Sequence, residues 1–265
     1  MSTITAPRFP DLLRGERTKL TSLRSTWWCL GVLTVLGLGF NALVPALMAG
    51  GWNTMDPATR ERFRSDTVGL VLQPGAQWAQ IAACVLGALL LASEFSTGTI
   101  RSTVLATPRR TPVLAAKAAV FATVLFGLGV LIAIPSLLIG SALVSAHASI
   151  ALGSLTTLRV VLGFGAYLAF TGVLALSVGA LVRHTAGAVA TILAIQFVLP
   201  AAFQFLPGAG GRHLAQALPA SANVMLGSGH DSSSVYSPLQ SLLILVGWTA
   251  VAYTAAHVTL KRRNV

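Results

Sequence analysis

Six long apolar runs constrain the fold of this chain more than any other feature. A helix rises 1.5 Å per residue, so about 20 apolar residues are needed to cross a hydrocarbon core of about 30 Å. The runs cover approximately residues 27–48, 76–93, 113–144, 158–181, 186–206 and 238–260. We therefore expect an all-α membrane protein in which six transmembrane helices form a single domain over residues 1–265.

The composition supports a bilayer rather than a nucleic acid as the main partner. The chain is 54% hydrophobic and only 9% charged, whereas soluble domains average about 25% charged residues. Its net charge of +11 would suit nucleic acid, but such proteins gather Lys and Arg on a water-facing domain. In this chain the Lys and Arg residues instead lie mostly in the segments between apolar runs. Cys29 and Cys84 both fall within those runs, so neither a disulfide framework nor a metal site is expected.

The distribution of charge predicts the orientation of the six spans. With both termini on one side, that side holds thirteen Lys and Arg and three acids, while the other side holds five cations and four acids. Cytoplasmic segments carry the excess of positive charge. We therefore expect a multi-pass protein of the plasma membrane with both termini cytoplasmic. The preference for Arg over Lys beside abundant Ala and Gly suggests a bacterial source.

The N-terminal segment, residues 1–26, precedes the first run and is too long and polar for the start of a cleaved signal peptide. Leu13, Leu20 and Trp27 are spaced by sevens, and Arg17 and Arg24 lie among the polar positions between them. This pattern predicts an amphipathic interfacial helix on the inner leaflet, with Asp11 as its N-cap. The alternative is a solvated basic tail.

Two outer loops are longer than six spans require. The first, residues 50–75, contains the charged stretch ATRERFRSDTV and could fold as a short surface helix. The second, residues 207–237, is divided by Gly and Pro into the pieces RHLAQAL and SANVML. Neither piece is long enough to span, so both are expected to be re-entrant or interfacial short helices before the sixth span.

Motifs for energy coupling and catalysis are missing. A P-loop requires a lysine directly after a glycine, and none of the three lysines has that position. Ion-coupled transport usually places ionisable groups mid-membrane, and the span centres lack them. No carboxylate pair or His/Cys cluster offers a catalytic metal site. The chain is therefore not expected to be an enzyme or to hydrolyse ATP alone.

The largest expected cytoplasmic loop contains clear signals for the start and end of helices. Its sequence is SEFSTGTIRSTVLATPRRTPVLAAK, from Ser93 to Lys117. Its sequence predicts a short amphipathic helix that ends before Pro108, and then the start of the third span at Thr111 and Pro112. Glu94 stands where a span meets the membrane surface, and a carboxylate there needs a partner. Arg101 is a candidate. This arrangement predicts a mechanical joint, although a loop whose cations only fix orientation is the alternative.

The stretch EFSTGTIRSTVLATPRR, residues 94–110, resembles the pattern at the end of span two in ABC-2 type transporter permeases. The amphipathic ERTKLTSLRSTWW and the loop before the sixth span resemble that family as well. The resemblance implies a permease subunit that pairs with a second copy or a paralogous permease and docks cytoplasmic ATP-binding subunits. It also implies that this chain binds no cofactor, since ATP and Mg²⁺ belong to the partner ATPase.

The resemblance further assigns residues to the coupling interface. From the loop these are Glu94, Gly98, Thr99, Ile100, Arg101, Pro108, Arg109 and Arg110; from the N-terminal helix they are Leu13, Arg17, Leu20 and Arg24.

Export of a hydrophobic or amphiphilic compound, such as a drug, a lipid-like molecule or a peptide, is the expected function. Candidate residues of the substrate path are aromatic: Phe40, Phe126, Phe164, Tyr167 and Phe170. Lipid-facing helices contain the same residue types, so these side chains could equally face the bilayer. The alternative function is that of a non-transporting membrane anchor or sensor subunit that recruits a cytoplasmic partner.

Overall fold

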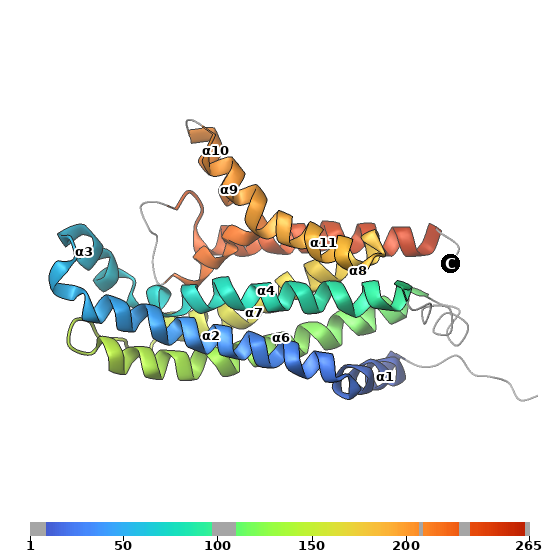
Figure 1. The fold of residues 1–265 in the computed structure, drawn as a ribbon, viewed down its shortest axis with the longest axis horizontal. Coiled ribbons are helices and arrows are strands. Elements are labelled where there is room, and N and C mark those ends of the chain that lie inside the picture. Colours follow the sequence, from blue (N-terminus) through green and yellow to red (C-terminus); the bar gives the residue numbers. More distant parts are fainter. Residues whose placement is uncertain (1–8, 97–109, 207–208, 228–233, 263–265) are drawn as a thin grey trace, which may run out of the picture.

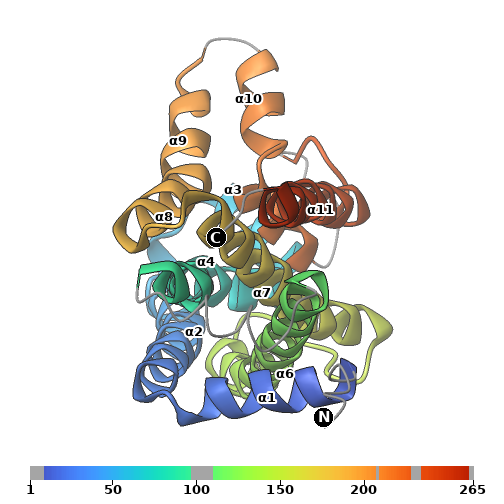
Figure 2. The same cartoon turned by 90° about the vertical axis from the view of Figure 1, so that its right-hand side faces the viewer.

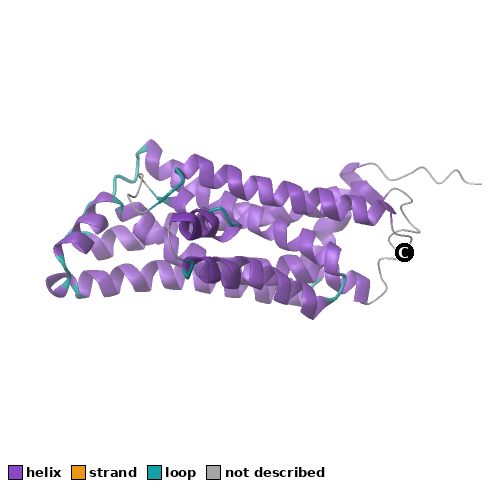
Figure 3. Cartoon of the chain, turned by 90° about the horizontal axis from the view of Figure 1, so that it is seen from above, coloured by secondary structure: helices purple, strands orange, loops and turns teal. Residues whose placement is uncertain are grey.

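The structure, a computed structural model, describes residues 9–96, 110–206, 209–227 and 234–262, and within these ranges it contains helices and loops but no strand (Figure 3). The long helices are α2 (Arg24–Gly50), α4 (Thr67–Ser96), α6 (Arg110–Val144), α7 (Leu155–Val182) and α11 (Pro238–Arg262). The fifth span is composite: α8 (Thr185–Leu193), η2 (Ala194–Val198) and α9 (Leu199–Gln204). The short elements are α1 (Phe9–Ser22), η1 (Trp52–Thr54), α3 (Pro57–Ser65), α10 (Ala209–Gln216) and η3 (Pro219–Leu226).

Within the described residues, six helices are long and apolar enough to cross a membrane. This confirms the predicted number of spans and, by length and composition, indicates a multi-pass membrane protein. The second span starts earlier than predicted, at Thr67 rather than near residue 76. The added turns run through Pro74, and the Gly75 N–H donates to Asn41 Oδ1 of α2 at 2.7 Å. Inside the predicted run, the polar side chains of Gln77 and Gln80 also find partners. Asn223 of η3 donates to Gln77 Oε1 at 3.1 Å, and the Tyr167 hydroxyl of α7 donates to Gln80 Oε1.

Helices α4 and α7 form the centre of the bundle and are the most buried of the six spans. Figure 2 shows them between α2 and α6 on one side and α8 and α11 on the other. Small residues permit this close approach, as is common in membranes. A Cβ at Gly87 of α4 would lie 2.5 Å from the Gly172 carbonyl oxygen of α7, and a Cβ at Gly129 of α6 would lie 2.7 Å from the Gly165 Cα.

Helix α1 lies across one end of the bundle, the end that also holds the last turn of α11, the end of α4 and the start of α6 (Figures 1 and 2). An N-terminal helix was expected, but its details differ. It begins at Phe9, so Asp11 lies within the first turn rather than at the N-cap. It ends at Ser22, and Trp27 belongs to α2, so the predicted stripe from Leu13 through Trp27 is divided between two helices.

The opposite end of the bundle holds the short helix that was predicted in the first outer loop. This helix is α3, and Asp56 is its N-cap, accepting a hydrogen bond from the Thr59 N–H at 3.0 Å. Hydrogen bonds from Thr59 hold the pKa of the Asp56 carboxyl below its usual value. Trp52 packs beneath α3 between Phe63 and His147, with ring centroids 5.5 and 4.4 Å away.

The fifth span changes helix type at its centre. The Leu199 N–H bonds to the Ala194 carbonyl five residues back, which defines the π-turn η2. Pro200 follows, and since proline lacks an N–H and crowds the carbonyl four residues before it, a regular α-helix cannot continue there. Beyond this point α9 and α10 stand away from the bundle (Figures 1 and 2). Both predicted short pieces are helical, in α10 and η3.

Candidate functional site

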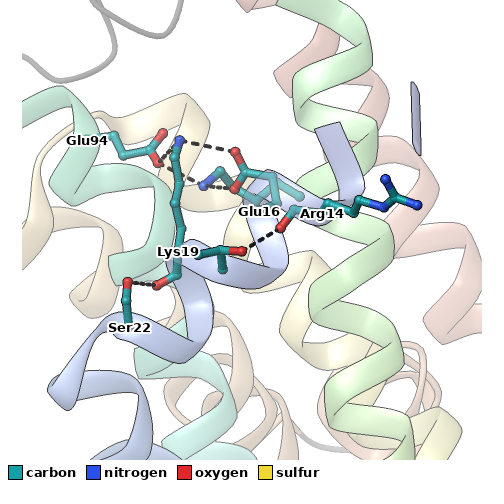
Figure 4. A network of polar contacts seen from close by, with 7 residues as sticks. Arg14, Glu16, Lys19, Ser22 and Glu94 are labelled. Carbon is teal, nitrogen blue, oxygen red and sulfur yellow. Dashed lines mark hydrogen bonds and ion pairs between the residues drawn. The ribbon is translucent and has the colours of Figure 1, made fainter. Parts of the chain in front are cut away.

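Lys117 is the centre of the most highly charged buried cluster in the described residues. It lies seven residues after the start of α6 and is only 3% exposed. Its ammonium donates to Glu94 Oε1 of α4 at 2.8 Å and forms an ion pair with Glu16 Oε2 of α1 at 2.7 Å. One cation therefore holds carboxylates from two other helices. Figure 4 labels these carboxylates, Glu16 and Glu94.

A second lysine completes the cluster. The Lys19 ammonium donates to Glu16 Oε1 at 3.2 Å and lies 3.7 Å from Glu94 Oε1. Lys19 is about half-exposed, whereas Glu16 is only 5% exposed. The two carboxylates and two ammonium groups sum to zero charge, which makes burial of the set tolerable. These four residues are called the Lys117 network below.

The position of the Lys117 network determines which helix movements it can transmit. Glu94 lies in the last turn of α4, just before the segment 97–109, and Lys117 lies in α6, just after it. The network therefore joins the last turn of α4 and the first part of α6 to each other and to α1. A displacement of any one of the three helices must move the other two or break an ion pair.

Helix α1 docks on the bundle because one face of it carries the right residues. Positions 13, 16 and 20 share a face of a helix. Leu13 is half-buried, Glu16 and Leu20 are buried, and the helix packs mainly on α6. The expected coupling residues Arg17 and Arg24 are exposed. The apolar face of α1 thus packs on protein, whereas the prediction placed it on the lipid leaflet.

The energetics of such a cluster are asymmetric. Removing one member of a buried ion pair typically destabilises a protein by about 3 to 5 kcal/mol, because the remaining charge is left without compensation. Replacing all members by neutral groups of similar volume is often close to neutral. The Lys117 network is therefore able to fix the relative positions of α1, α4 and α6 without being a large net source of stability.

The charges of the network are paired within the network itself. Its four charges are engaged with one another at 2.7 to 3.7 Å. In the described ranges no three His, Cys, Asp or Glu side chains are grouped so that they could hold a metal ion.

Of the residues expected to couple to a partner, Glu94 is placed at the centre of this site. Arg110 is the first residue of α6. Gly98, Thr99, Ile100, Arg101, Pro108 and Arg109 lie outside the described residues. The expected pair of Glu94 with Arg101 consequently stays a prediction, and the described partners of Glu94 are Lys117 and Lys19.

The five aromatic residues predicted to line a substrate path do not gather in one place. Phe164 and Tyr167 are fully buried in the core of the bundle. Phe126 and Phe170 line a groove of about 450 Å³ between α6, α7 and α11. Phe40 of α2 stacks on Trp78 of α4, with ring centroids 4.8 Å apart.

The residues that sequence reasoning missed are Glu16, Lys19 and Lys117. A signal for Lys117 was available, because it lies inside the third apolar run and an ionisable residue in a span usually needs a partner. A signal for Glu16 was weaker: it is an acid in a strongly basic helix.

Comparison with known proteins found no match, either among protein-family models or among curated proteins.

Proposed function

We propose that this chain is the permease subunit of an ABC-2 type exporter. In this proposal, separate cytoplasmic ATPase subunits bind the end of the bundle that holds α1 and the segment 97–109. They supply the ATP and Mg²⁺ sites, because the sequence has no P-loop. A second copy or a paralogous permease completes the transport path.

The observation that carries the proposal is the Lys117 network. A partner that pushes on segment 97–109 or on α1 acts on elements that the network already holds together. Glu94 and Lys117 transmit that push to α4 and α6, and α4 runs through the core of the bundle against α7. A cycle of ATP binding and hydrolysis would thereby move two spans at once, which is what opening a path across the membrane requires.

The proposed substrate class follows from the apolar lining of a groove in the bundle rather than from a specific set of polar contacts. The groove that contains Phe126 and Phe170 is lined almost wholly by apolar side chains, with Thr123 and Thr249 as its hydroxyl groups. Such a lining suits a hydrophobic or amphiphilic compound, and burial of apolar area is its main source of affinity.

The proposal is tested by isolating the chain from the membranes of its own host with an affinity tag. The expected result is a co-purifying subunit that hydrolyses ATP, while the chain purified alone hydrolyses none. An anchor or sensor subunit would instead purify with a partner that lacks ATPase activity. Hydrolysis by the isolated chain would contradict the proposal directly.

A further inference from the structure

A groove of about 430 Å³ lies between α1, α2 and α6, apart from the Lys117 network. Its walls are apolar and include Leu30 of α2 and Phe121, Leu128 and Leu131 of α6, over a floor that contains Leu86 of α4. Leu131 is 67% exposed, so the groove opens on the surface of the bundle. Gly127 also lines it, and a Cβ at that position would meet no atom within 4 Å, so there is free space beside it.

The dimensions of the groove match one lipid chain. Phe121 and Leu131 are ten residues apart on α6 and therefore about 15 Å apart along its axis. One leaflet contributes about half of a hydrocarbon core of about 30 Å. The groove thus extends from the α1 end of the bundle to about the depth of one leaflet.

The mouth of the groove is formed by the junction of α1 and α2, which has properties of an anion site. Leu23 is the N-cap of α2 and provides no side-chain hydrogen bond, and the first turn of α2 contains no acidic residue. The Thr26 N–H donates to the Leu23 carbonyl at 3.1 Å, but no side chain caps the helix, so the positive dipole end of this 27-residue helix is not neutralised by a cap. Helix N-termini of this kind bind phosphate.

A buried hydroxyl at the mouth gives independent support. Thr26 lines the groove, is only 4% exposed, and its Oγ1 has no hydrogen-bond partner within the described part of the chain. A buried hydroxyl without a partner is unfavourable, because the hydrogen bond it loses to water is not replaced. A ligand oxygen at this position would accept its hydrogen bond.

The charges around the mouth are complementary to an anion. Arg24 is the first residue of α2, and Arg17 lies one turn before Thr21, which also lines the groove; both arginines are exposed. The carbonyl groups at the end of α1 are partly occupied, since the Trp27 indole N–H donates to the Thr21 carbonyl at 2.9 Å. The nearby acid Glu16 is held by Lys19 and Lys117.

We propose that this groove binds an anionic phospholipid of the leaflet in which α1 lies. One acyl chain occupies the apolar groove beside Gly127, and the phosphate lies at the N-terminus of α2, where Thr26, Arg17 and Arg24 can reach it. The bound lipid would fill the space under the α1–α2 junction and so fix the position of α1. The inference does not depend on the transport function.

The test is native mass spectrometry of the full chain, reconstituted in vesicles of equal parts phosphatidylglycerol and phosphatidylcholine with identical acyl chains and then released in mild detergent. The wild-type protein is expected to retain one phosphatidylglycerol, in preference to phosphatidylcholine. Arg17→Gln with Arg24→Gln should reduce that preference by up to about thirtyfold. Each basic residue near an anionic surface raises the affinity for it about fivefold, and the two factors multiply.

A second variant tests the acyl-chain part separately. Gly127→Leu should fill the groove and abolish retention of both lipids, whereas Gly247→Leu, at another glycine whose Cβ would meet open space, should leave retention unchanged. Arg262→Gln is the matched control for the arginines, because it lies at the same end of the bundle on α11.

Size-exclusion elution and helical circular dichroism check that each variant is folded. Equal retention of the two lipids by the wild-type protein would overturn the headgroup site, and normal retention by Gly127→Leu would overturn the groove. If Gly127→Leu instead separates a dimer into monomers without changing lipid retention, the groove is a contact between copies and the proposal is wrong.

Discussion

At the scale of single residues, Lys117 and its partners concentrate most of the buried charge of the described chain. The four members of the Lys117 network come from three helices, α1, α4 and α6, and Glu16 and Lys117 are almost completely buried. The structure thus gives Glu94 a role that its position already suggested, as a carboxylate held at the root of a loop. Its partners are long-range: Lys19 and Lys117 lie in α1 and α6.

Replacing the central lysine should be strongly destabilising. Lys117→Met removes the cation and leaves Glu16 and Glu94 close together, so the free energy of unfolding should fall by about 3 to 5 kcal/mol. Thermal unfolding in detergent measures the loss. Lys261→Met, at an exposed lysine in the last turn of α11, is the matched control and should change stability by less than about 0.5 kcal/mol.

Neutralising the whole buried set should restore most of that loss. The triple variant Glu16→Gln, Glu94→Gln and Lys117→Met leaves no uncompensated buried charge, so its unfolding temperature should return toward that of the wild-type chain. If the triple variant is instead less stable than Lys117→Met alone, the three side chains act through packing and the ion-pair interpretation is wrong.

At the scale of elements, the close contact of α4 with α7 depends on glycine. A Cβ at Gly87 would lie 2.5 Å from a backbone oxygen of α7, and backbone atoms cannot move aside as a flexible side chain can. The same bundle tolerates glycines elsewhere without such contacts. Gly39 of α2, for example, is exposed and a Cβ there would meet nothing within 4 Å.

Substitution at these two glycines should therefore have opposite outcomes. Gly87→Val should separate α4 from α7 and lower the free energy of unfolding by about 1 to 3 kcal/mol, the usual effect of overpacking. Gly39→Val should leave thermal unfolding nearly unchanged. Similar unfolding temperatures for the two variants would contradict the close contact between the backbones of α4 and α7 at Gly87.

The elements also show what sequence alone could and could not establish. The apolar runs predicted all six spans, because a helix must cover about 30 Å of hydrocarbon whatever its tertiary contacts. The start of α4 was misplaced because Pro74 and Gly75 locally favour a turn. Asn41 of α2 accepts the Gly75 N–H within the helix, and no local pattern reveals that partner. Glu94 was identifiable from its isolation at a span end. Its pairing with Lys117 and Lys19 was not, because it depends on how α1 docks against α6.

At the scale of the whole molecule, both proposed sites lie at one end of the bundle. The Lys117 network and the α1–α2 junction are both built from α1, and the last turn of α11 lies at the same end (Figure 1). Charge asymmetry predicts that this end is cytoplasmic. Helix α3 lies at the opposite end and would face outward.

Orientation can be tested with single cysteines in a chain whose Cys29 and Cys84 are replaced by Ala. A cysteine at Ser22, the last residue of α1, should react with a membrane-impermeant maleimide only after the cells are opened. A cysteine at Glu61 of α3 should react in intact cells. Both positions are exposed. Labelling of both from outside would contradict the six-span topology.

The most direct test of the central claim is ATP-driven export of a fluorescent amphiphile, Hoechst 33342, from proteoliposomes that contain the chain with its co-purified ATPase. The wild-type complex should couple hydrolysis to export. The neutral triple variant at Glu16, Glu94 and Lys117 should fold, bind the ATPase and hydrolyse ATP, but export the dye at a small fraction of the wild-type rate. Export by the triple variant at the wild-type rate would contradict the account, because the Lys117 network would then hold the helices together without transmitting any movement.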